Sequence, residues 1–223
     1  MTLLVADVRL RETEVRPVGL GLDALVHDGH QLAADVVASC LPEQLLDDSI
    51  TSTGVDTWQR SEDEPVATLE DLEWADGVAL GTPTRFGNVA AQLKQFMDQA
   101  GHLWQEGKLA DRVGTAFTAS MTAHGGQEST ILALNNTLYH WGMVILPLGY
   151  TVSEVFNAGG NPYGTSFTSG QTVAGPDDEA LAVARYQGQR LARYAAVIAA
   201  AREADAFHVH RPRPERFHAA AHR

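Results

Sequence analysis

The sequence feature that most restricts the fold is an alternation of short apolar runs with longer segments of helical periodicity, which begins near residue 76. Three runs have the length and composition of buried strands, and they occupy residues 77–81 (GVALG), 113–119 (VGTAFTA) and 143–148 (MVILPL). Strands that alternate with helices at this spacing form βαβ units, in which helical crossovers join parallel strands. The alternation therefore predicts an α/β domain with a parallel sheet.

Helical patterns fill the intervals between these runs. Residues 88–100 carry apolar side chains at the spacing of one helix face, and Asn88 is a suitable N-cap. Further helices are expected over 126–141 and, started by acidic residues, over 176–201. In parallel sheets, ligands bind where the carboxyl ends of strands meet helix N-termini. That rule directs attention to the loops at 82–88, 119–127 and 149–165.

The first third of the chain has weaker periodicity. Residues 51–65 are polar and acidic, which indicates a surface loop, and Thr68 is the expected N-cap of a short helix over 68–74. The remaining expectations are a strand at 2–10, a helix at 22–32 and a second strand at 35–41.

The length of 223 residues suits one domain, expected over residues 1–203, followed by a basic tail over 204–223. Residues 207–223 hold four arginines and one glutamate, so they carry +3 of a chain whose net charge is −12. Their four histidines could chelate a metal ion, but the irregular spacing favours a disordered tail.

The acidic net charge disfavours nucleic acid as a partner. Cys40 is the only cysteine, so no intrachain disulfide can form, and no residue spacing indicates a metal site. No apolar run reaches the length of a membrane span. These features favour a cytoplasmic protein that acts on small molecules.

Two loops carry candidate chemistry. The first, Pro83-Thr84-Arg85-Phe86-Gly87-Asn88, offers a hydroxyl, a guanidinium and an aromatic face between a strand and a helix. The second, residues 120–128 (SMTAHGGQE), offers hydroxyls and two glycines that allow close backbone approach to a ligand. Each loop also fits an ordinary strand-to-helix connection. Hydroxyls, glycines and aromatic residues at strand ends suit a flat cofactor better than a hydrolytic triad.

Two further residues stand out beside aromatic neighbours. His140 lies in the context Leu-Tyr-His-Trp-Gly, where a satisfied core or interface histidine is the alternative to a functional one. Trp104 lies at an expected helix end, where it either fills the core or forms the wall of a planar pocket.

Several sequence blocks resemble the WrbA-type NAD(P)H:quinone oxidoreductases. They run in order from about residue 69 to about residue 190, and comprise GTPTRFGNVAAQLKQFMDQAGHLWQEGKLADRVGTAF, HGGQEST, LYHWGMVILPLGY, GGNPYGTSF and ARYQG. The resemblance implies a flavodoxin-like three-layer αβα sandwich with a doubly wound, parallel five-stranded sheet. It also implies noncovalent FMN, two-electron reduction of quinones by NADH or NADPH, and a homotetramer.

The same resemblance implies the site residues. Trp104 would flank the site of the quinone and nicotinamide, and His140, contributed across a subunit boundary, would lie near the flavin; these two are the catalytic candidates. The cofactor-binding residues would be His140 together with Thr84, Arg85, Phe86, Gly87 and Asn88 of the first loop and Ser120, Met121, Thr122, Ala123, His124 and Gly125 of the second.

The segment expected to bind the FMN phosphate departs from the family pattern. Members of the family have a loop rich in hydroxyls and glycine after the first strand, whereas residues 16–24 (RPVGLGLDA) keep two glycines but no hydroxyl. Three explanations stay open: a divergent N-terminus, a disturbed reading frame, or loss of flavin. The competing functions are accordingly a flavodoxin-like electron carrier and a non-enzymatic member with a degenerate phosphate site.

Overall fold

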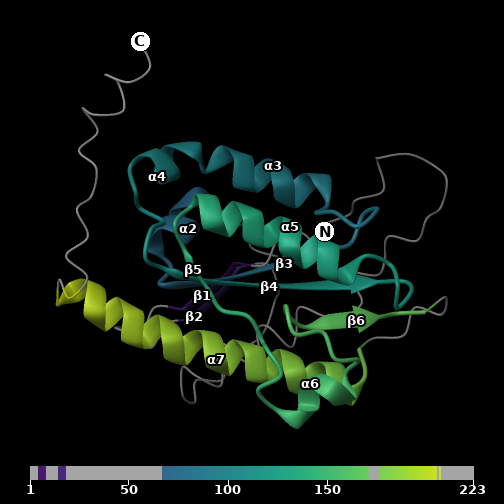
Figure 1. Cartoon of the computed structure of the whole chain (residues 1–223). Coiled ribbons are helices and arrows are strands. Elements are labelled where there is room, and N and C mark those ends of the chain that lie inside the picture. Colours follow the sequence, from purple (N-terminus) through teal and green to yellow (C-terminus); the bar gives the residue numbers. More distant parts are fainter. Residues whose placement is uncertain (1–4, 9–14, 19–66, 171–175, 205, 207–223) are drawn as a thin grey trace.

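The fold is seen in a computed structural model that describes residues 5–8, 15–18, 67–170, 176–204 and 206 (Figure 1). Two strands at its centre, β3 (Gly77–Pro83) and β4 (Val113–Ser120), are buried along their whole length. They pair in parallel, in continuous register from Gly77 opposite Val113 to Pro83 opposite Ala119. Their burial on both faces explains why the sequence shows unbroken apolar runs here.

The outer edge of β4 is covered by two short strands, β5 (Val144–Ile145) and β6 (Ser166–Thr168). Both run parallel to β4, and they pair with its first and last residues respectively. The chain between them, which includes helix α6 (Ser153–Asn157), leaves this edge and returns to it. The expected strand at 143–148 is therefore shorter than predicted.

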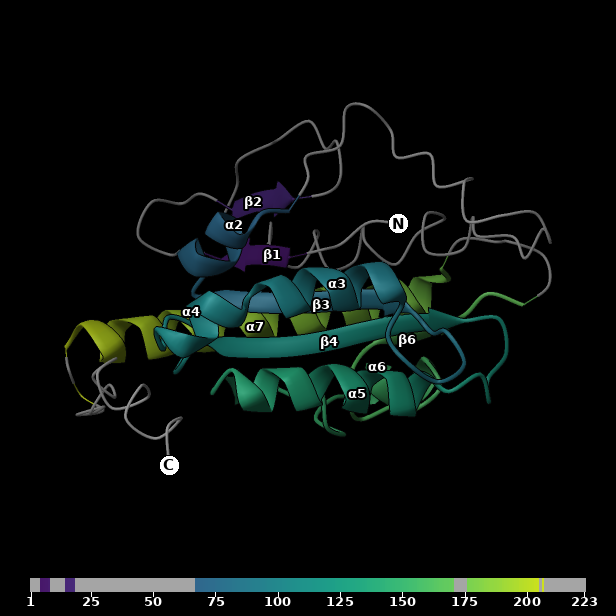
Figure 2. The same cartoon turned by 90° about the horizontal axis from the view of Figure 1, so that it is seen from above.

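The other edge of the sheet is antiparallel. Strand β1 (Val5–Val8) pairs antiparallel with β2 (Val15–Val18) and also with β3, which gives the order β2-β1-β3-β4-β5. Figure 2 shows the first four of these strands side by side. The expectation of a wholly parallel five-stranded sheet is wrong. Only six residues separate β1 from β2, and a parallel crossover needs a dozen or more.

The strand expected at 2–10 is observed as β1. The helix expected at 22–32, the strand at 35–41, the loop at 51–65 and nearly all of the tail from residue 204 lie outside the described residues.

The helices largely match their sequence patterns. Helix α2 begins after Thr68, whose side chain and that of Asp71 form a capping box. The expected Asn88 cap is wrong: α3 begins after Ala90, which makes no side-chain cap bond. The helices are α2 (Leu69–Trp74), α3 (Ala91–Gln99), α4 (Gly101–Gln105), α5 (Gln127–His140) and α7 (Asp178–Glu203).

Helices cover both faces of the sheet, so the α/β class and the three layers are confirmed (Figure 1). On one face, Ala79 and Phe117 pack with α7 residues such as Leu191 in one buried cluster. On the other face, Val78 and Leu80 belong to a cluster that includes residues of α2, α3, α4 and α5. Alternate residues of the same strand therefore face opposite layers, and the carboxyl ends of β3 and β4 emerge together at one edge.

Candidate functional site

The loop after β3 folds as a tight turn. The N–H of Arg85 donates to the carbonyl of Asn88 at 2.9 Å, and the N–H of Asn88 donates back to the carbonyl of Arg85 at 3.0 Å. Between them, Phe86 and Gly87 have left-handed backbones, with φ of 54° and 74°. This is the pattern of a type I′ turn. Glycine adopts that backbone freely, whereas phenylalanine is strained there.

The strained position carries a fully exposed aromatic ring, since the relative exposure of Phe86 is 102%. Nothing in the packing of the described residues requires phenylalanine at this tip. An aromatic side chain held in solvent on a strained backbone is typical of a ligand-binding position.

The loop after β4 presents backbone donors. Residues 121–124 are exposed, and Ser120 Oγ donates to the carbonyl of Thr122 at 2.7 Å. Among the residues that the structure describes, no acceptor is found for the N–H groups of Thr122, Ala123 and His124. Helix α5 begins directly after this loop, so its positive dipole end lies beside these donors.

The two loops form one surface. Thr84 Oγ1 donates to the carbonyl of Gly125 at 3.3 Å, and Thr130 Oγ1 donates to Thr84 Oγ1 at 2.7 Å. Ser129 Oγ donates to the carbonyl of Gly87 at 2.8 Å. The first loop is therefore bonded both to the second loop and to the first turn of α5.

This surface has the chemistry that the isoalloxazine ring of FMN needs. The ring has flat apolar faces, which Phe86 and the half-exposed Met121 can contact, and carbonyl groups at one edge, which the N–H donors of the second loop can bind. The residues present therefore fit the ring. On the phosphate side, Arg16, Pro17 and Val18 lie within β2, and residues 19–24 lie outside the described part of the chain.

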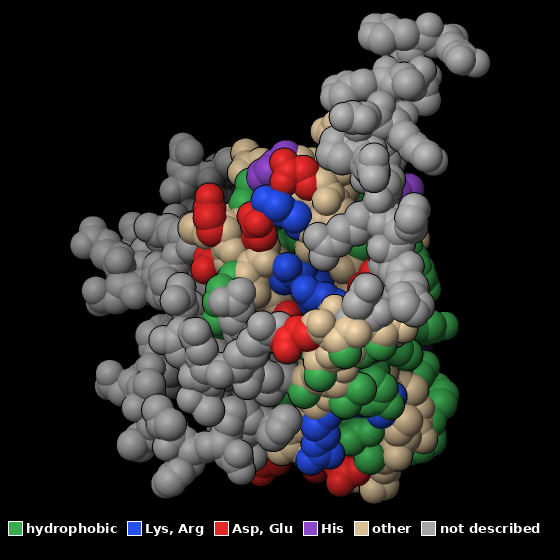
Figure 3. All heavy atoms as spheres, turned by 90° about the vertical axis from the view of Figure 1, so that its left-hand side faces the viewer, with side chains coloured by type: hydrophobic (Ala, Val, Ile, Leu, Met, Phe, Trp, Pro, Cys, Tyr) green, Lys and Arg blue, Asp and Glu red, His purple; other side chains and the backbone are tan. Residues whose placement is uncertain are grey.

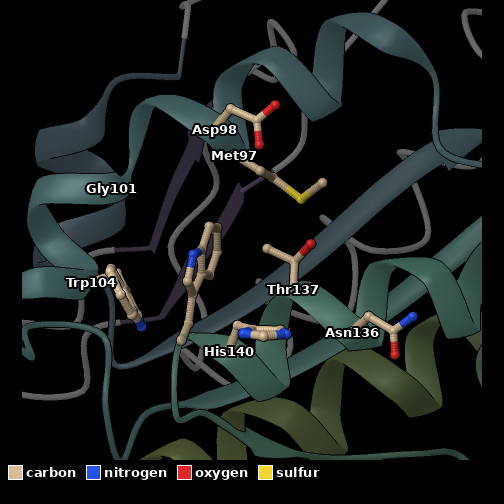
Figure 4. A pocket seen from close by; sticks show the side chains of 8 residues that line it. Met97, Asp98, Gly101, Trp104, Asn136, Thr137 and His140 are labelled. Carbon is tan, nitrogen blue, oxygen red and sulfur yellow. The ribbon is translucent and has the colours of Figure 1, made fainter.

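A pocket of about 350 Å³ lies elsewhere, between α3, α4 and α5 (Figure 4). Trp104 of α4 and His140 of α5 line it from facing elements, and Trp104 is 48% exposed. The other lining residues are Met97, Asp98, Gly101, Asn136, Thr137 and Trp141.

The structure does not bring the catalytic candidates to the loops within one chain. The second loop precedes the first residue of α5, whereas His140 is the last residue of that 14-residue helix. At about 1.5 Å per residue, the helix separates the two places by about 20 Å. Helix α4 and the last turn of α5, which carry Trp104 and His140, thus lie toward the amino ends of the strands, away from the two loops (Figure 1).

Sequence reasoning missed Gln127, which is 7% exposed and links three elements. Its Nε2 lies 2.8 Å from Ser120 Oγ, 2.9 Å from the carbonyl of Phe167 and 3.1 Å from Thr168 Oγ1. Ser129 and Thr130 were missed as well. All three belong to the HGGQEST block, of which the sequence analysis selected only His124 and Gly125 as cofactor-binding candidates.

Charged side chains of both signs lie next to each other on the face shown in Figure 3. Lys108 pairs with Glu73 at 2.7 Å and with Glu106 at 2.9 Å, and Arg202 pairs with Asp76 at 3.1 Å. The hydrogen bond from Lys108 lowers the pKa of the Glu106 carboxyl, and the bonds to Glu73 and Glu106 raise the pKa of the Lys108 amine.

None of the helices in the described part of the chain combines the length and apolar character needed to cross a membrane. Within those same residues, no group of three or more His, Cys, Asp or Glu side chains is arranged to hold a metal ion.

Comparison with known proteins places this geometry in a family. Residues 22–157 match the profile described as NADPH-dependent FMN reductase. A protein of Geotalea uraniireducens named NAD(P)H dehydrogenase (quinone) is 41% identical over 79% of this chain and 91% of its own length. A protein of the same name from Syntrophobacter fumaroxidans is 45% identical over 73% of this chain and 82% of its own.

A solved structure is also similar, that of a protein described as "the flavodoxin, WrbA-like protein" of Agrobacterium tumefaciens. It is 26% identical, with a TM-score of 0.48, over 58% of this chain and 71% of its own. The family profile covers more than half of the chain, and the relatives named NAD(P)H dehydrogenase (quinone) confirm the resemblance read from the sequence blocks. The chain belongs to the NADPH-dependent FMN reductase family.

Proposed function

We propose that this chain is an FMN-dependent oxidoreductase that reduces quinones by two electrons taken from NADH or NADPH. The observation that carries the proposal is the single surface formed by the loops after β3 and β4, with exposed Phe86 on one loop and backbone N–H donors on the other. The names of the relatives agree with this chemistry.

The proposed cofactor residues lie on these two loops. Phe86 and Met121 would contact the faces of the flavin ring, and the N–H groups of residues 122–124 would bind its polar edge. Arg85 would supply positive charge beside that edge, which favours the electron-rich reduced form. The remaining cofactor-binding candidates are Thr84, Gly87, Asn88, Ser120 and Gly125.

The redox chemistry, a two-electron transfer from NAD(P)H to a quinone, belongs to the cofactor. The chain's own residues bind, orient and exclude water. Both substrates must reach the same exposed ring face, so they would occupy it in turn, with ping-pong kinetics. We propose that Trp104 and His140 of one subunit line the substrate site of a neighbouring subunit, since they lie far from the loops of their own chain.

A homotetramer is proposed on the same grounds. Exposed apolar side chains occur along the layer that holds α4 and α5, and each subunit would cover those of another. They include Leu132, Tyr139 and Trp104, with Phe86 and Met121 on the adjoining loops. A cytoplasmic location is proposed from the single cysteine, Cys40.

One observation favours a second candidate, a non-enzymatic member of the family. Arg16, Pro17 and Val18 lie in an antiparallel strand, and residues 16–24 carry no hydroxyl for a phosphate. An electron carrier that binds FMN has less support, because it needs no substrate pocket, whereas this chain has a pocket lined by Trp104 and His140 that we propose holds substrate.

The absorption spectrum of the purified protein separates these functions first. An enzyme or a carrier shows the visible absorption of oxidised flavin, or acquires it on titration with FMN, whereas a protein with an empty site stays colourless. Steady-state turnover of NADH or NADPH with benzoquinone then separates the enzyme from the carrier. A colourless protein that does not bind added FMN contradicts the proposed function.

Arg85→Ala tests the site. Loss of a charge-assisted hydrogen bond is expected to weaken the binding of FMN by about tenfold to a hundredfold. Arg193→Ala, on the exposed side of α7, is the matched control and should leave affinity and turnover unchanged. Equal FMN affinity in Arg85→Ala and the wild type would show that the assigned role is wrong.

A further inference from the structure

We propose that Ser129 and Thr130, in the first turn of α5, are positioning residues that hold the loop after β3 in register with the loop after β4. Neither residue would contact the flavin ring directly. Each would act on it by fixing the distance and angle between Phe86 on one loop and the backbone donors on the other. This inference rests on the proposed function, because the ring that the loops enclose is that of FMN.

Ser129 fixes the tip of the first loop. Its Oγ lies 2.8 Å from the carbonyl of Gly87 and 3.1 Å from the carbonyl of Gly126. Gly87 follows Phe86 directly, so this bond determines where the strained turn and its exposed ring lie relative to α5. Ser129 itself is exposed, and its hydroxyl contributes nothing to the apolar core.

Thr130 fixes the base of the same loop. Its side chain is completely buried, and its Oγ1 donates to Thr84 Oγ1 at 2.7 Å. Thr84 donates in turn to the carbonyl of Gly125 at 3.3 Å. Thr130 Oγ1 also lies 2.8 Å from the carbonyl of Gly126. A short chain of hydroxyls thus runs from the helix through the first loop to the second.

These bonds act at the loops rather than in the fold as a whole. None of these bonds pairs two strands, and neither Ser129 nor Thr130 belongs to the apolar clusters that cover the two faces of the sheet. Gln127, in contrast, joins the ends of β4 and β6 to α5, which is a role in the fold. Ser129 and Thr130 therefore differ from Gln127 in what their loss should change.

The test compares isosteric and conservative variants. Thr130→Val removes the hydroxyl and keeps the shape, Thr130→Ser keeps the hydroxyl, and Ser129→Ala removes the bond to Gly87. For each we would measure the Kd for FMN by titration of the apoprotein, the spectrum of the bound flavin and the Tm of the apoprotein. Losing one neutral hydrogen bond is expected to weaken the binding of FMN about two- to tenfold.

Two control variants separate positioning from structure. Thr115→Val removes a buried hydroxyl of β4 that lies 2.8 Å from the carbonyl of Leu146 and 2.7 Å from Gln187 Nε2, and it should lower Tm without weakening FMN. Ser153→Ala makes the matching surface change at the start of α6 and should change neither quantity.

The expected result is weaker FMN binding and a shifted flavin spectrum in Thr130→Val and Ser129→Ala, with recovery in Thr130→Ser. The apoprotein Tm should stay close to the wild type in Ser129→Ala, whereas Thr130→Val should lower it about as much as Thr115→Val, since both remove a buried hydroxyl. The inference is overturned if Thr130→Val binds FMN as the wild type does, if Thr130→Ser is as weak as Thr130→Val, or if Thr115→Val weakens FMN equally. If the wild type itself does not bind FMN, it is the proposed function that fails. If the wild type binds FMN and the variants bind it equally well, only the inference about Ser129 and Thr130 fails.

Discussion

Gly126 and Gly87 come so close that their backbones touch: a methyl group on the Cα of Gly126 would lie 2.6 Å from the Cα of Gly87. Gly126 precedes α5, and Gly87 belongs to the turn after β3. Contacts shorter than about 3 Å are not tolerated between a Cβ and backbone atoms. The separation of the two loops is therefore set by two residues without side chains.

Gly126→Ala is expected to move the loops apart. The backbone of Gly126 has φ of 91°, so alanine adds strain of about 1–2 kcal/mol and also collides with Gly87. Because the proposed flavin surface spans both loops, we expect FMN affinity to fall at least about tenfold, which corresponds to the loss of one or two hydrogen bonds. Titration of the apoprotein with FMN measures this.

Gly159→Ala is the matched control for that change. Gly159 has φ of 93°, nearly the same as Gly126, but a methyl group on its Cα would meet no atom of the described residues within 4 Å. Since the backbone strain is similar in the two variants, the control should lower Tm by about 2–4 °C for each kcal/mol of strain. It should leave FMN affinity unchanged. Similar losses of FMN affinity in both variants would mean that backbone strain, not loop separation, is responsible.

Phe86→Asn should stabilise the apoprotein and weaken FMN binding. Asparagine tolerates the left-handed backbone of Phe86, so the apoprotein should gain up to about 1 kcal/mol, or a few degrees in Tm. The same change removes the aromatic face offered to the flavin and should weaken FMN. Thermal unfolding of the apoprotein and FMN titration measure the two effects.

Phe86→Tyr is the companion variant. It keeps the aromatic ring and the strained backbone, so it should retain FMN affinity without the gain in Tm. A Phe86→Asn protein that is less stable than the wild type would show that the ring is needed for the turn itself.

The sequence predicted the central strands well because β3 and β4 are buried on both faces. Their apolar runs are uninterrupted, so they depend little on which neighbours the sheet has. The loops after them were predicted for the same reason, since their position follows from where the strands end. The division of the outer edge of the sheet into β5 and β6 was not predicted. Both strands are short, and their pairing with opposite ends of β4 depends on how the chain segment between them folds.

Local preference failed where a residue had two possible roles. Asn88 resembles a helix cap, but its backbone closes the turn with Arg85 and its side chain donates to the carbonyl of Phe86, so it cannot also cap α3. The roles of Ser129 and Thr130 depend on contacts across more than forty residues of sequence. No local pattern reports such contacts. The antiparallel β1–β2 pair was missed because the family resemblance implied a parallel first strand.

The charges around Lys108 predict a pH dependence of stability. Its bonds lower the pKa of Glu106 and raise its own pKa, and the largest cause in each case is a side-chain hydrogen bond. Because its pKa is lowered, the Glu106 carboxylate stabilises the fold at pH values above the ordinary pKa of glutamate. This stabilisation is lost as the pH falls through the lowered pKa. Because its pKa is raised, the Lys108 amine stabilises the fold at pH values below the ordinary pKa of lysine. This stabilisation is lost as the pH rises through the raised pKa.

Lys108→Met should therefore lower Tm slightly at neutral pH, because Glu106 is exposed to solvent and Lys108 and Glu73 are partly exposed. The difference from the wild type should shrink in acid, where Glu106 becomes protonated. Lys94→Met, which removes the exposed pair with Asp98 on α3, is the control for a lost surface ion pair. A Tm difference that grows toward low pH would contradict the assignment.

The distance between the loops and His140 predicts complementation between subunits. Arg85→Ala disables the loop half of a site, and His140→Ala disables the pocket half. If each site takes its loops from one subunit and His140 from another, mixed oligomers of the two variants contain some sites with both halves intact. Random mixing in equal amounts would restore about one quarter of the sites. If both halves came from the same chain, no mixture would recover activity.

The measurement is the rate of quinone reduction after the two purified variants are unfolded together and refolded. Each variant refolded alone is the control, and we expect the mixture to be more active than either.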